Sequence, residues 1–417
     1  MMMVIKTLSR LSFKFIKIWD KVIPKNNNSM VICSDSLSDN LLYFYFYLRE
    51  SEFKDIEIKI LTKGKSDKEL KNGLREDKLK NIFLNFEDDL TKLKIKKFRS
   101  LTGFWNFIKA KYVVMKESDG YFQSYFQNNK NKIFVCLWHG IPMKAIGLLN
   151  KESTIKNQNK KDFNWTHFLV SSEIEKEVMK KSWELSDDEI IIQGYPRNEY
   201  LLKNKNNELL KKEIRNRIEN KLDFKPTKII MYAPTYRSIE TTKFFPFDDF
   251  EIKVLEEYCE QNDVLFILRT HINEYNDDQD GLVKLNNLLE SKYFILGNDF
   301  IEMQNYLLTI DMLITDYSGS FFDFLLMDKP IYIIPYDYSE YEKRRGFSID
   351  MSNIISNLSI NNFAELIEII DKSHIYTENL KEYFEYSKNQ FHNYLLKDSL
   401  SISENILSEI FKKQNLS

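Results

Sequence analysis

The chain has 417 residues, of which 43% are hydrophobic and 14% aromatic, so it carries enough apolar material for a compact fold and is not a disordered protein. Since single cores rarely exceed about 250–300 residues, the length predicts two domains. Its 60 basic and 62 acidic residues leave a formal net charge of −2, which excludes a nucleic-acid binder that works through a broad basic face.

The first segment, residues 1–27, is basic and amphipathic. Its cationic residues recur among apolar ones at roughly helical spacing: Lys6, Arg10, Lys14, Lys17 and Lys21. No apolar run of the chain approaches the ~20 residues that span a bilayer, and charges interrupt this segment too often for a signal peptide. Two interpretations stay open, a helix lying on an anionic membrane surface and a helix packed on the protein with its lysines in solvent.

Short apolar runs of strand length recur through the first half of the chain. They lie at 30–36, 55–62, 111–115, 132–138, 167–172 and 189–195. The first run leads into an expected helix that begins near residue 39, and charged segments separate the others. Strands that alternate with helical or loop segments predict a parallel sheet with crossover connections.

A stretch rich in lysine and asparagine, residues 203–228, separates this half from a second series of strands. These runs lie at 228–234, 264–270, 293–297, 311–316 and 330–336, and helices are expected beyond residue 361. We place the boundary near residues 221–225, with an N-terminal domain at 28–222 and a C-terminal domain at 223–417. The expected class is α/β, with two Rossmann-like parallel-sheet domains that face a central cleft and bind ligands beyond the carboxyl ends of their strands.

The segment ITDYSGSFFDF, residues 314–324, follows an apolar strand. The strand runs into Asp316, and Ser318, Gly319 and Ser320 then precede an apolar helix. Small residues, hydroxyl groups and a helix start can together hold a phosphate or pyrophosphate. The alternative is an ordinary helix cap, because serine and aspartate favour that position anyway.

A second candidate is LWHGIPMKAIG, residues 137–147, where a strand ends at His139 and Gly140. An imidazole titrates near neutrality, so His139 could accept a proton from an attacking hydroxyl, and Lys144 could attract a phosphate. A lone histidine is more often a structural group, but a histidine and a glycine at a strand end followed by a proline favour a functional role.

Three further strand ends carry cationic or stacking residues. Arg269 and His271 alternate at the end of one strand, so both can face the same phosphate. A second strand runs into the segment Pro234, Thr235, Tyr236 and Arg237, and GYPRNEY supplies Arg197 and Asn198. Each group could be structural by itself, for example as an ion pair at a domain rim.

The sequence lacks several known signatures, which narrows the chemistry. It contains no P-loop, GxGxxG, GxSxG or HExxH motif and no kinase motif set. The acidic residues of FDDF and NDDQD lie in polar or turn-like sequence, so we expect no required cofactor and no metal bound at high affinity, and a divalent cation stays an open alternative. Cys33, Cys136 and Cys259 are widely spaced, which favours buried thiols in a reducing cytoplasm.

Taken in order, these motifs resemble the CDP-glycerol glycerophosphotransferase family of teichoic acid primases and polymerases. The resemblance rests on SDNLLYFYFYL, WHGIPMKAIG, GYPRNEYL, MYAPTYR, LRTH and ITDYSGSFFDFLLMDKPIYIIPYDYSEYEKRRGF, which together span most of residues 38–350. It implies a GT-B fold with an acceptor-side N-terminal domain and a nucleotide-binding C-terminal domain. The enzyme would be cytoplasmic and peripheral at the inner face of the plasma membrane.

The resemblance also assigns roles to residues. His139 resembles the family's proposed general base, Arg269 and His271 resemble its donor phosphate contacts, and Ser318–Ser320 resemble its pyrophosphate loop. The remaining expected donor contacts are Pro234, Thr235, Tyr236, Arg237, Asp316 and Asp323, and the expected acceptor or phosphate contacts are Gly140, Lys144, Arg197 and Asn198. The implied reaction moves a polyol phosphate from CDP-glycerol or CDP-ribitol to a polyol-phosphate or lipid-linked acceptor, and CMP leaves.

The sequence departs from the family pattern at two places, and two alternative functions stay open. The loop reads SGS where the family commonly has adjacent serines, and RRGFSIDMSN lacks a proline-glycine-proline segment. The first alternative is a GT-B glycosyltransferase that uses a nucleotide sugar, which donor screening would distinguish. The second is a non-catalytic assembly partner, which would bind a ligand without turnover. The polyol, the acceptor and the number of units added are not specified by the sequence.

Overall fold

The protein is described here by a computed structural model that covers residues 18–76, 86–117, 122, 129–152, 165–235, 237, 243–269, 279–297, 302–373, 378, 380–397 and 401–412. The chain divides into two compact units. Unit 1 comprises Met1–His139, Asn157–Tyr200 and Lys397–Ser417, and unit 2 comprises Gly140–Lys156 and Leu201–Leu396. The folding domains expected from the sequence, 28–222 and 223–417, stay a prediction that separate expression of the two segments would test.

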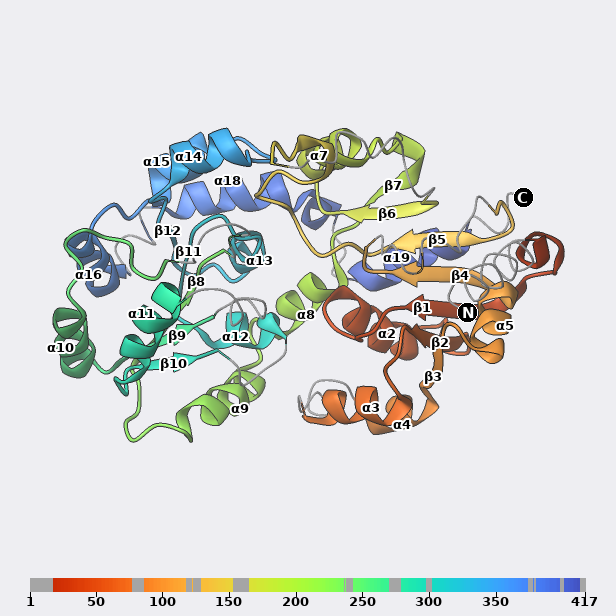
Figure 1. Ribbon diagram of the computed structural model, residues 1–417, viewed down its shortest axis with the longest axis horizontal. Coiled ribbons are helices and arrows are strands. Elements are labelled where there is room, and N and C mark those ends of the chain that lie inside the picture. The colour runs from red at the N-terminus through yellow and green to blue at the C-terminus, as the bar shows by residue number, and fades with distance from the viewer. Residues whose placement is uncertain are drawn as a thin grey trace, which may run out of the picture. The chain divides into compact units, whose positions relative to one another are not determined.

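Unit 1 is built on a parallel sheet, which within the described residues has seven strands in the order β3-β2-β1-β4-β5-β6-β7 (Figure 1). The strands are β1 (Asn26–Cys33), β2 (Glu57–Thr62), β3 (Lys94–Lys97), β4 (Ala110–Met115), β5 (Ile133–Cys136), β6 (His167–Val170) and β7 (Ile190–Ile192). All six strands predicted in this half are confirmed. The edge strand β3 was not predicted because three of its four residues are lysines, which also protect an exposed edge from pairing with another chain.

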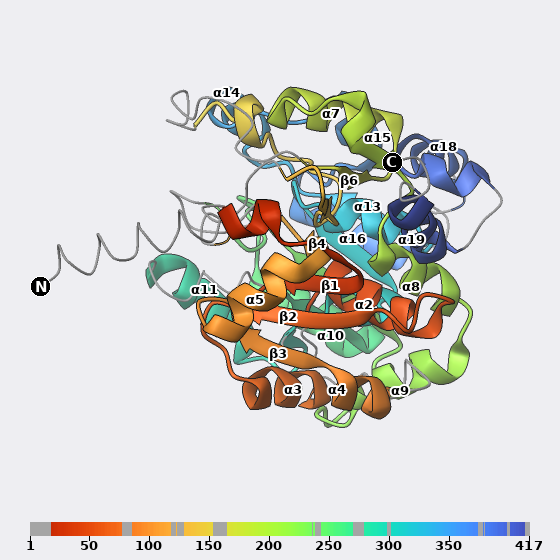
Figure 2. The ribbon, with the colours of Figure 1, turned by 90° about the vertical axis from the view of Figure 1, so that its right-hand side faces the viewer.

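Helices and connecting loops join these strands. The helices are α2 (Asn40–Glu50), α3 (Asp67–Glu76), α4 (Phe86–Lys92), α5 (Leu101–Lys109), α7 (Glu173–Trp183), the first turns of α8 (Pro196–Asn204) and α19 (Ile402–Lys412). Residues 40–48 of α2 are all buried, as expected for a helix that is apolar on every side. Figure 2 shows α5, which packs against β1, β3 and β4. Gly103 permits this approach, because a Cβ there would lie 2.1 Å from the Lys97 carbonyl oxygen.

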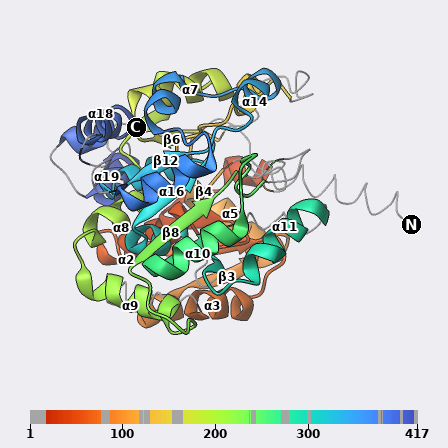
Figure 3. The same ribbon diagram turned by 90° about the vertical axis from the view of Figure 1, so that its left-hand side faces the viewer.

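Unit 2 contains a second parallel sheet, which among the described residues has five strands in the order β10-β9-β8-β11-β12 (Figure 3). The strands are β8 (Lys228–Ala233), β9 (Val264–Leu268), β10 (Phe294–Leu296), β11 (Met312–Thr315) and β12 (Ile331–Ile333). All five correspond to predicted strands. Their residues are almost completely buried, which is typical of parallel strands covered on both faces.

The helices of unit 2 pack against this sheet and against one another. They are the end of α8, α9 (Glu208–Glu219), α10 (Ile252–Asn262), α11 (Gln279–Leu289), α12 (Met303–Thr309), α13 (Ser320–Leu325), α14 (Tyr338–Arg344), α15 (Ser352–Leu358), α16 (Phe363–Asp371) and α18 (Lys381–Phe391). Contacts join α10 to β9, α11 to β10 and α13 to β11 and β12. None of the helices in the described parts of the chain is both long and apolar enough to cross a bilayer.

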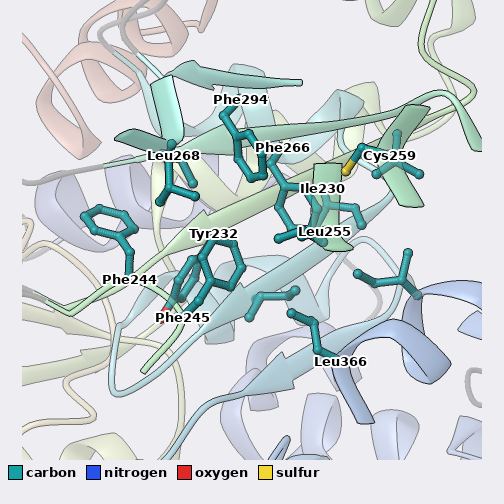
Figure 4. Packing of buried hydrophobic residues seen from close by; sticks show 14 of the residues in the cluster. Ile230, Tyr232, Phe244, Phe245, Leu255, Cys259, Phe266, Leu268, Phe294 and Leu366 are labelled. Atoms are coloured by element: carbon teal, nitrogen blue, oxygen red, sulfur yellow. The ribbon is translucent and has the colours of Figure 1, made fainter. Parts of the chain in front are cut away.

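The core of unit 2 is rich in aromatic side chains (Figure 4). Phe266 and Phe294 from neighbouring strands stack with ring centroids 5.5 Å apart, and Phe245 packs on Tyr232 at 4.9 Å. Each such buried ring contributes about 1.5–3 kcal/mol to folding, so the core holds the ends of β8, β9 and β11 in fixed register. The thiol of Cys259 is buried in this core, and those of Cys33 and Cys136 are buried in unit 1.

Candidate functional site

Each sheet reverses its strand order at one point, and the polar residues of interest follow the strands beside that point. In unit 1 the reversal lies between β1 and β4, and in unit 2 between β8 and β11. Loops leave such neighbouring strands in opposite directions, so a crevice opens at the carboxyl end of the sheet and commonly binds ligands. Each unit therefore has one site that its own topology favours.

His139 follows β5, which pairs with β4, one of the two strands at the reversal in unit 1. It lies in a turn with unusual backbone geometry. Trp138 has φ 52° and Gly140 has φ 104°, so the residues on either side of His139 both have a positive φ. A tryptophan in that region costs about 1–2 kcal/mol. The buried Asn40 side chain holds the turn, because its Nδ2 donates to the carbonyls of Leu137 at 3.1 Å and Trp138 at 2.9 Å.

The imidazole of His139 lies between an aromatic ring and a carboxylate. The Trp138 ring stacks on it with centroids 4.0 Å apart, and its Nε2 lies 3.5 Å from Oε2 of Glu117. About a third of the His139 side chain is exposed, so a substrate can reach it. The hydrogen bond with His139 lowers the pKa of Glu117, which keeps that carboxyl group ionised. This geometry suits a base that takes a proton from a hydroxyl group.

Arg197 and Asn198 lie in the first turn of α8, and both side chains are buried. Nη1 of Arg197 donates to Oδ1 of Asp39 at 2.8 Å, and its backbone N–H donates to Oδ1 of Asn40 at 3.2 Å. Burial by itself raises the pKa of Asp39, but the charges of Arg197 and Lys116 outweigh it and lower that pKa. Most of the charge of Arg197 is thus balanced inside unit 1, and the predicted contacts of Arg197 and Asn198 with an acceptor stay predictions.

In unit 2 a buried arginine links the ends of β8 and β11. Nη2 of Arg237 lies 3.0 Å from Asp316 and 3.2 Å from Asp337, and its side chain is 1% exposed. Asp316 also accepts a hydrogen bond from the backbone N–H of Thr235, which follows Pro234 after β8. Three aromatic rings surround the guanidinium at 4.6–5.6 Å, those of Tyr317, Tyr336 and Tyr341. Arg237 therefore braces the loop after β11, and direct donor contacts of Pro234, Thr235 and Arg237 stay predictions.

The loop of Ser318, Gly319 and Ser320 lies at the start of α13. The hydroxyl of Ser320 donates to that of Ser318 at 3.0 Å, so the two serines lie on the same side of the turn. A Cβ on Gly319 would lie 3.0 Å from the carbonyl oxygen of Ile141, which explains why glycine occupies the middle of the loop. Asp323, one turn further along α13, is buried.

The segment after His139 packs against this loop region within unit 2. Lys144 pairs with Phe347 in an antiparallel bridge, and the backbone N–H of Ala145 donates to the Gly346 carbonyl at 3.0 Å. Gly346 has φ 86°, a conformation that favours glycine. This pairing brings residues that are about two hundred positions apart in the sequence to the same strand-end region.

Lys144 brings a positive charge close to the loop. Burial first, and then the nearby charge of Arg345, lower the pKa of Lys144 to about 8, while Asp316 raises it. Within the described residues, no carboxylate oxygen lies within ion-pairing distance of its ammonium group. A partly desolvated ammonium group of this kind attracts phosphate oxygens.

Arg269 leaves the end of β9 and contacts the neighbouring strand end. Its Nη1 donates to the carbonyl of Gly297, and its guanidinium lies 5.5 Å from the Tyr306 ring centroid. Arg269 and the Asp316–Ser320 loop thus follow strands of the same sheet on either side of β8. His271 and Tyr236 lie outside the described residues, so their predicted roles stay predictions.

Four polar residues of these sites were not predicted from the sequence: Glu117, Asp39, Asn40 and Asp337. A signal for Glu117 was present, since it follows the end of the strand KYVVM by two residues, and His139 follows the end of β5 by three. Asp39 and Asn40 were treated only as the start of a helix. Across the described residues, no group of three His, Cys, Asp or Glu side chains is arranged to hold a metal ion.

Comparison with known proteins identifies relatives along nearly the whole chain. The sequence model of the family described as CDP-glycerol:poly(glycerophosphate) glycerophosphotransferase matches residues 16–412. A teichoic acid glycerol-phosphate transferase of Staphylococcus aureus is 27% identical over 290 residues, which cover 66% of this chain and 70% of that protein. A teichoic acid poly(glycerol phosphate) polymerase of Bacillus spizizenii is 29% identical over 307 residues, which cover 69% and 72%.

A ribitol enzyme and a solved structure extend the comparison. A teichoic acid poly(ribitol-phosphate) polymerase of Bacillus spizizenii is 25% identical over 394 residues, covering 92% of this chain and 57% of that protein. The structure of the wall teichoic acid polymerase TagF matches with a TM-score of 0.74 at 20% identity, covering 99% of this chain and 97% of that chain. The resemblance read from the sequence motifs and the expected α/β fold of GT-B type are both confirmed.

Proposed function

The chain belongs to the CDP-glycerol:poly(glycerophosphate) glycerophosphotransferase family, and on that premise we propose that it transfers a polyol phosphate from a CDP-activated donor to a hydroxyl group of a cell-surface polymer or its lipid-linked precursor. The observation that carries the proposal is the extent of the family match. Residues 16–412 include both strand-order reversals, with His139 after the strand that neighbours the first and the 316–320 loop at the second.

In the proposed reaction, an acceptor hydroxyl attacks the phosphorus that carries the polyol. A new P–O bond forms, the P–O bond to CMP breaks, and the hydroxyl proton passes to His139. Arg269 and His271 neutralise the charge that develops on the phosphoryl oxygens, and the Ser318–Ser320 loop holds the nucleotide phosphates. Catalysis then depends on positioning and on fixed charges rather than on a covalent enzyme intermediate.

The direct test measures CMP release by the purified full-length chain. CDP-glycerol, CDP-ribitol and representative nucleotide sugars are offered in parallel, each with a lipid-linked or polyol-phosphate acceptor. Acceptor-dependent CMP release from a CDP-polyol supports the proposal and identifies the donor. Turnover of a nucleotide sugar alone would contradict it and indicate a glycosyltransferase.

A substitution then tests the role of the base. His139→Ala is expected to lower kcat at least 100-fold while donor binding by calorimetry changes little, because the side chain acts on the acceptor hydroxyl. His392→Ala is a control at a histidine with a structural hydrogen bond to the Phe322 carbonyl. Normal turnover of a folded His139 variant would show that the base has been assigned to the wrong residue.

We also propose that the enzyme works at the anionic inner face of the plasma membrane. Ile18, Trp19 and Val22 are 56%, 52% and 68% exposed, while Asp20 between them is buried and lies 2.6 Å from the buried ammonium of Lys132. Residues 18–22 are helical, are fixed to unit 1 through Asp20 and present apolar side chains to solvent, as interfacial helices do.

Vesicle binding tests this location. Replacing Ile18, Trp19 and Val22 together by serine is expected to lower binding to phosphatidylglycerol vesicles by about tenfold or more. Trp183→Ser, at another exposed tryptophan of unit 1, is the matched control. Equal binding by the triple variant and the control would contradict the proposal.

A further inference from the structure

A carboxylate that the sequence analysis did not consider lies beside the proposed base. β4 and β5 are neighbours in register, with Met115 opposite Cys136. The chain continues two residues from Met115 to Glu117 and three residues from Cys136 to His139, so both side chains lie at the same carboxyl edge of the sheet. Oε2 of Glu117 lies 3.5 Å from Nε2 of His139.

The contact determines which nitrogen of the ring can work as a base. A carboxylate only accepts hydrogen bonds, so Nε2 must carry the proton that points toward Glu117. In a neutral imidazole the lone pair is then on Nδ1. Stacking on Trp138 restrains the tilt of the imidazole plane. The Asn40 hydrogen bonds hold the backbone from which the His139 side chain extends.

The charges around the His139 ring indicate that Glu117 offsets the positive charge that the ring gains when it takes a proton. Among the described residues of unit 1, Asp39 and Glu117 interact with the charge of His139, Lys116 lies near both carboxylates, and Arg197 lies beside Asp39. Asp39 is already ion-paired with Arg197 at 2.8 Å. Without Glu117, Asp39, which already pairs with Arg197, would remain to offset both Lys116 and a ring that must itself become positive during the reaction.

We propose that Glu117 is a positioning residue for His139: it accepts a hydrogen bond from Nε2–H, keeps the tautomer whose Nδ1 takes the proton of the acceptor hydroxyl, and balances the charge of the imidazolium that results. This proposal rests on the proposed function. The proton moves from the hydroxyl oxygen to Nδ1 as the new P–O bond forms and CMP leaves, and it passes to solvent afterwards. Glu117 stays ionised throughout and touches no reacting atom.

The test compares Glu117→Gln and Glu117→Asp with a matched control, Glu57→Gln. Glu57 is 39% exposed against 49% for Glu117 and also forms surface ion pairs, but it begins β2 and so lies at the opposite, amino-terminal edge of the sheet. We expect Glu117→Gln to lower kcat roughly 5- to 50-fold with an unchanged KM for the donor. Glu117→Asp should recover part of kcat, and Glu57→Gln should match the wild type.

Nuclear magnetic resonance gives a readout that does not require turnover. The full-length chain is labelled with ¹⁵N at histidine, and the His139 signals are those that His139→Asn removes. We expect a wild-type tautomer protonated at Nε2, and a mixture of the two tautomers in Glu117→Gln. The same tautomer in both proteins would overturn the role of Glu117. If no donor releases CMP, the proposed function fails, and the ¹⁵N spectra still decide the contact between Glu117 and His139.

Discussion

Replacing Asn40 by alanine is expected to loosen the turn that carries His139. The wild-type amide donates to the carbonyls of Leu137 and Trp138 and accepts from the backbone N–H of Arg197, at 3.1, 2.9 and 3.2 Å. Alanine leaves these three backbone groups buried without their partner. Each net hydrogen bond contributes about 1 kcal/mol, and a buried unpaired group costs about 1–3 kcal/mol.

With partial relaxation of the turn, the free energy of unfolding of unit 1 should fall by about 3–5 kcal/mol. Urea unfolding followed by tryptophan fluorescence measures this change. All five tryptophans, Trp19, Trp105, Trp138, Trp165 and Trp183, belong to unit 1, so the signal reports on that unit and not on unit 2. We also expect kcat to fall by at least about tenfold, because the turn no longer fixes the base.

Asn28→Ala is the control, since the exposed amide of Asn28 donates to the Asp55 carbonyl at 3.2 Å in the same unit. Its loss should change the free energy of unfolding by no more than about 0.5 kcal/mol. A loss below about 1 kcal/mol in Asn40→Ala, together with an unchanged kcat, would refute the idea that this amide holds the catalytic turn.

Three further predictions concern charges. Burial lowers the pKa of Lys144 to about 8, so its ammonium group loses its charge as the pH rises through 8, and the wild-type kcat/KM should fall between pH 8 and 9. Lys144→Arg stays charged in this range and should remove that fall. Burial raises the pKa of Glu175 to about 7, so between about pH 4.5 and 7 the folded state keeps this carboxyl group protonated while the unfolded state does not. The free energy of unfolding of unit 1 should therefore fall, by at most about 3 kcal/mol, as the pH rises through that window. Glu175→Gln should flatten this dependence in urea titrations. Arg237→Met should destabilise unit 2 by about 3–5 kcal/mol in calorimetry, because Asp316 and Asp337 lose their partner, and an unchanged transition would contradict the bracing role.

The sequence by itself determined the strands and most of the residues at their ends. Apolar runs such as KIIMYAP and DMLITD identify buried strands because the pattern is local, and polar residues directly after them lie at the binding edge of any parallel sheet. His139, Arg269 and the Ser318–Ser320 loop were found in this way. β3 was missed because its lysines hide the pattern of an edge strand.

Only the tertiary structure decided which strand ends are neighbours and what each side chain contacts. Asn40 bonds to Trp138 across 98 residues of chain, and Thr235 bonds to Asp316 across 81. Contacts at such separations depend on the strand order, which the local pattern does not specify. The same reason applies to the Glu117 carboxylate beside His139 and to Arg237, which the sequence offers as a free phosphate partner but the fold buries between two carboxylates.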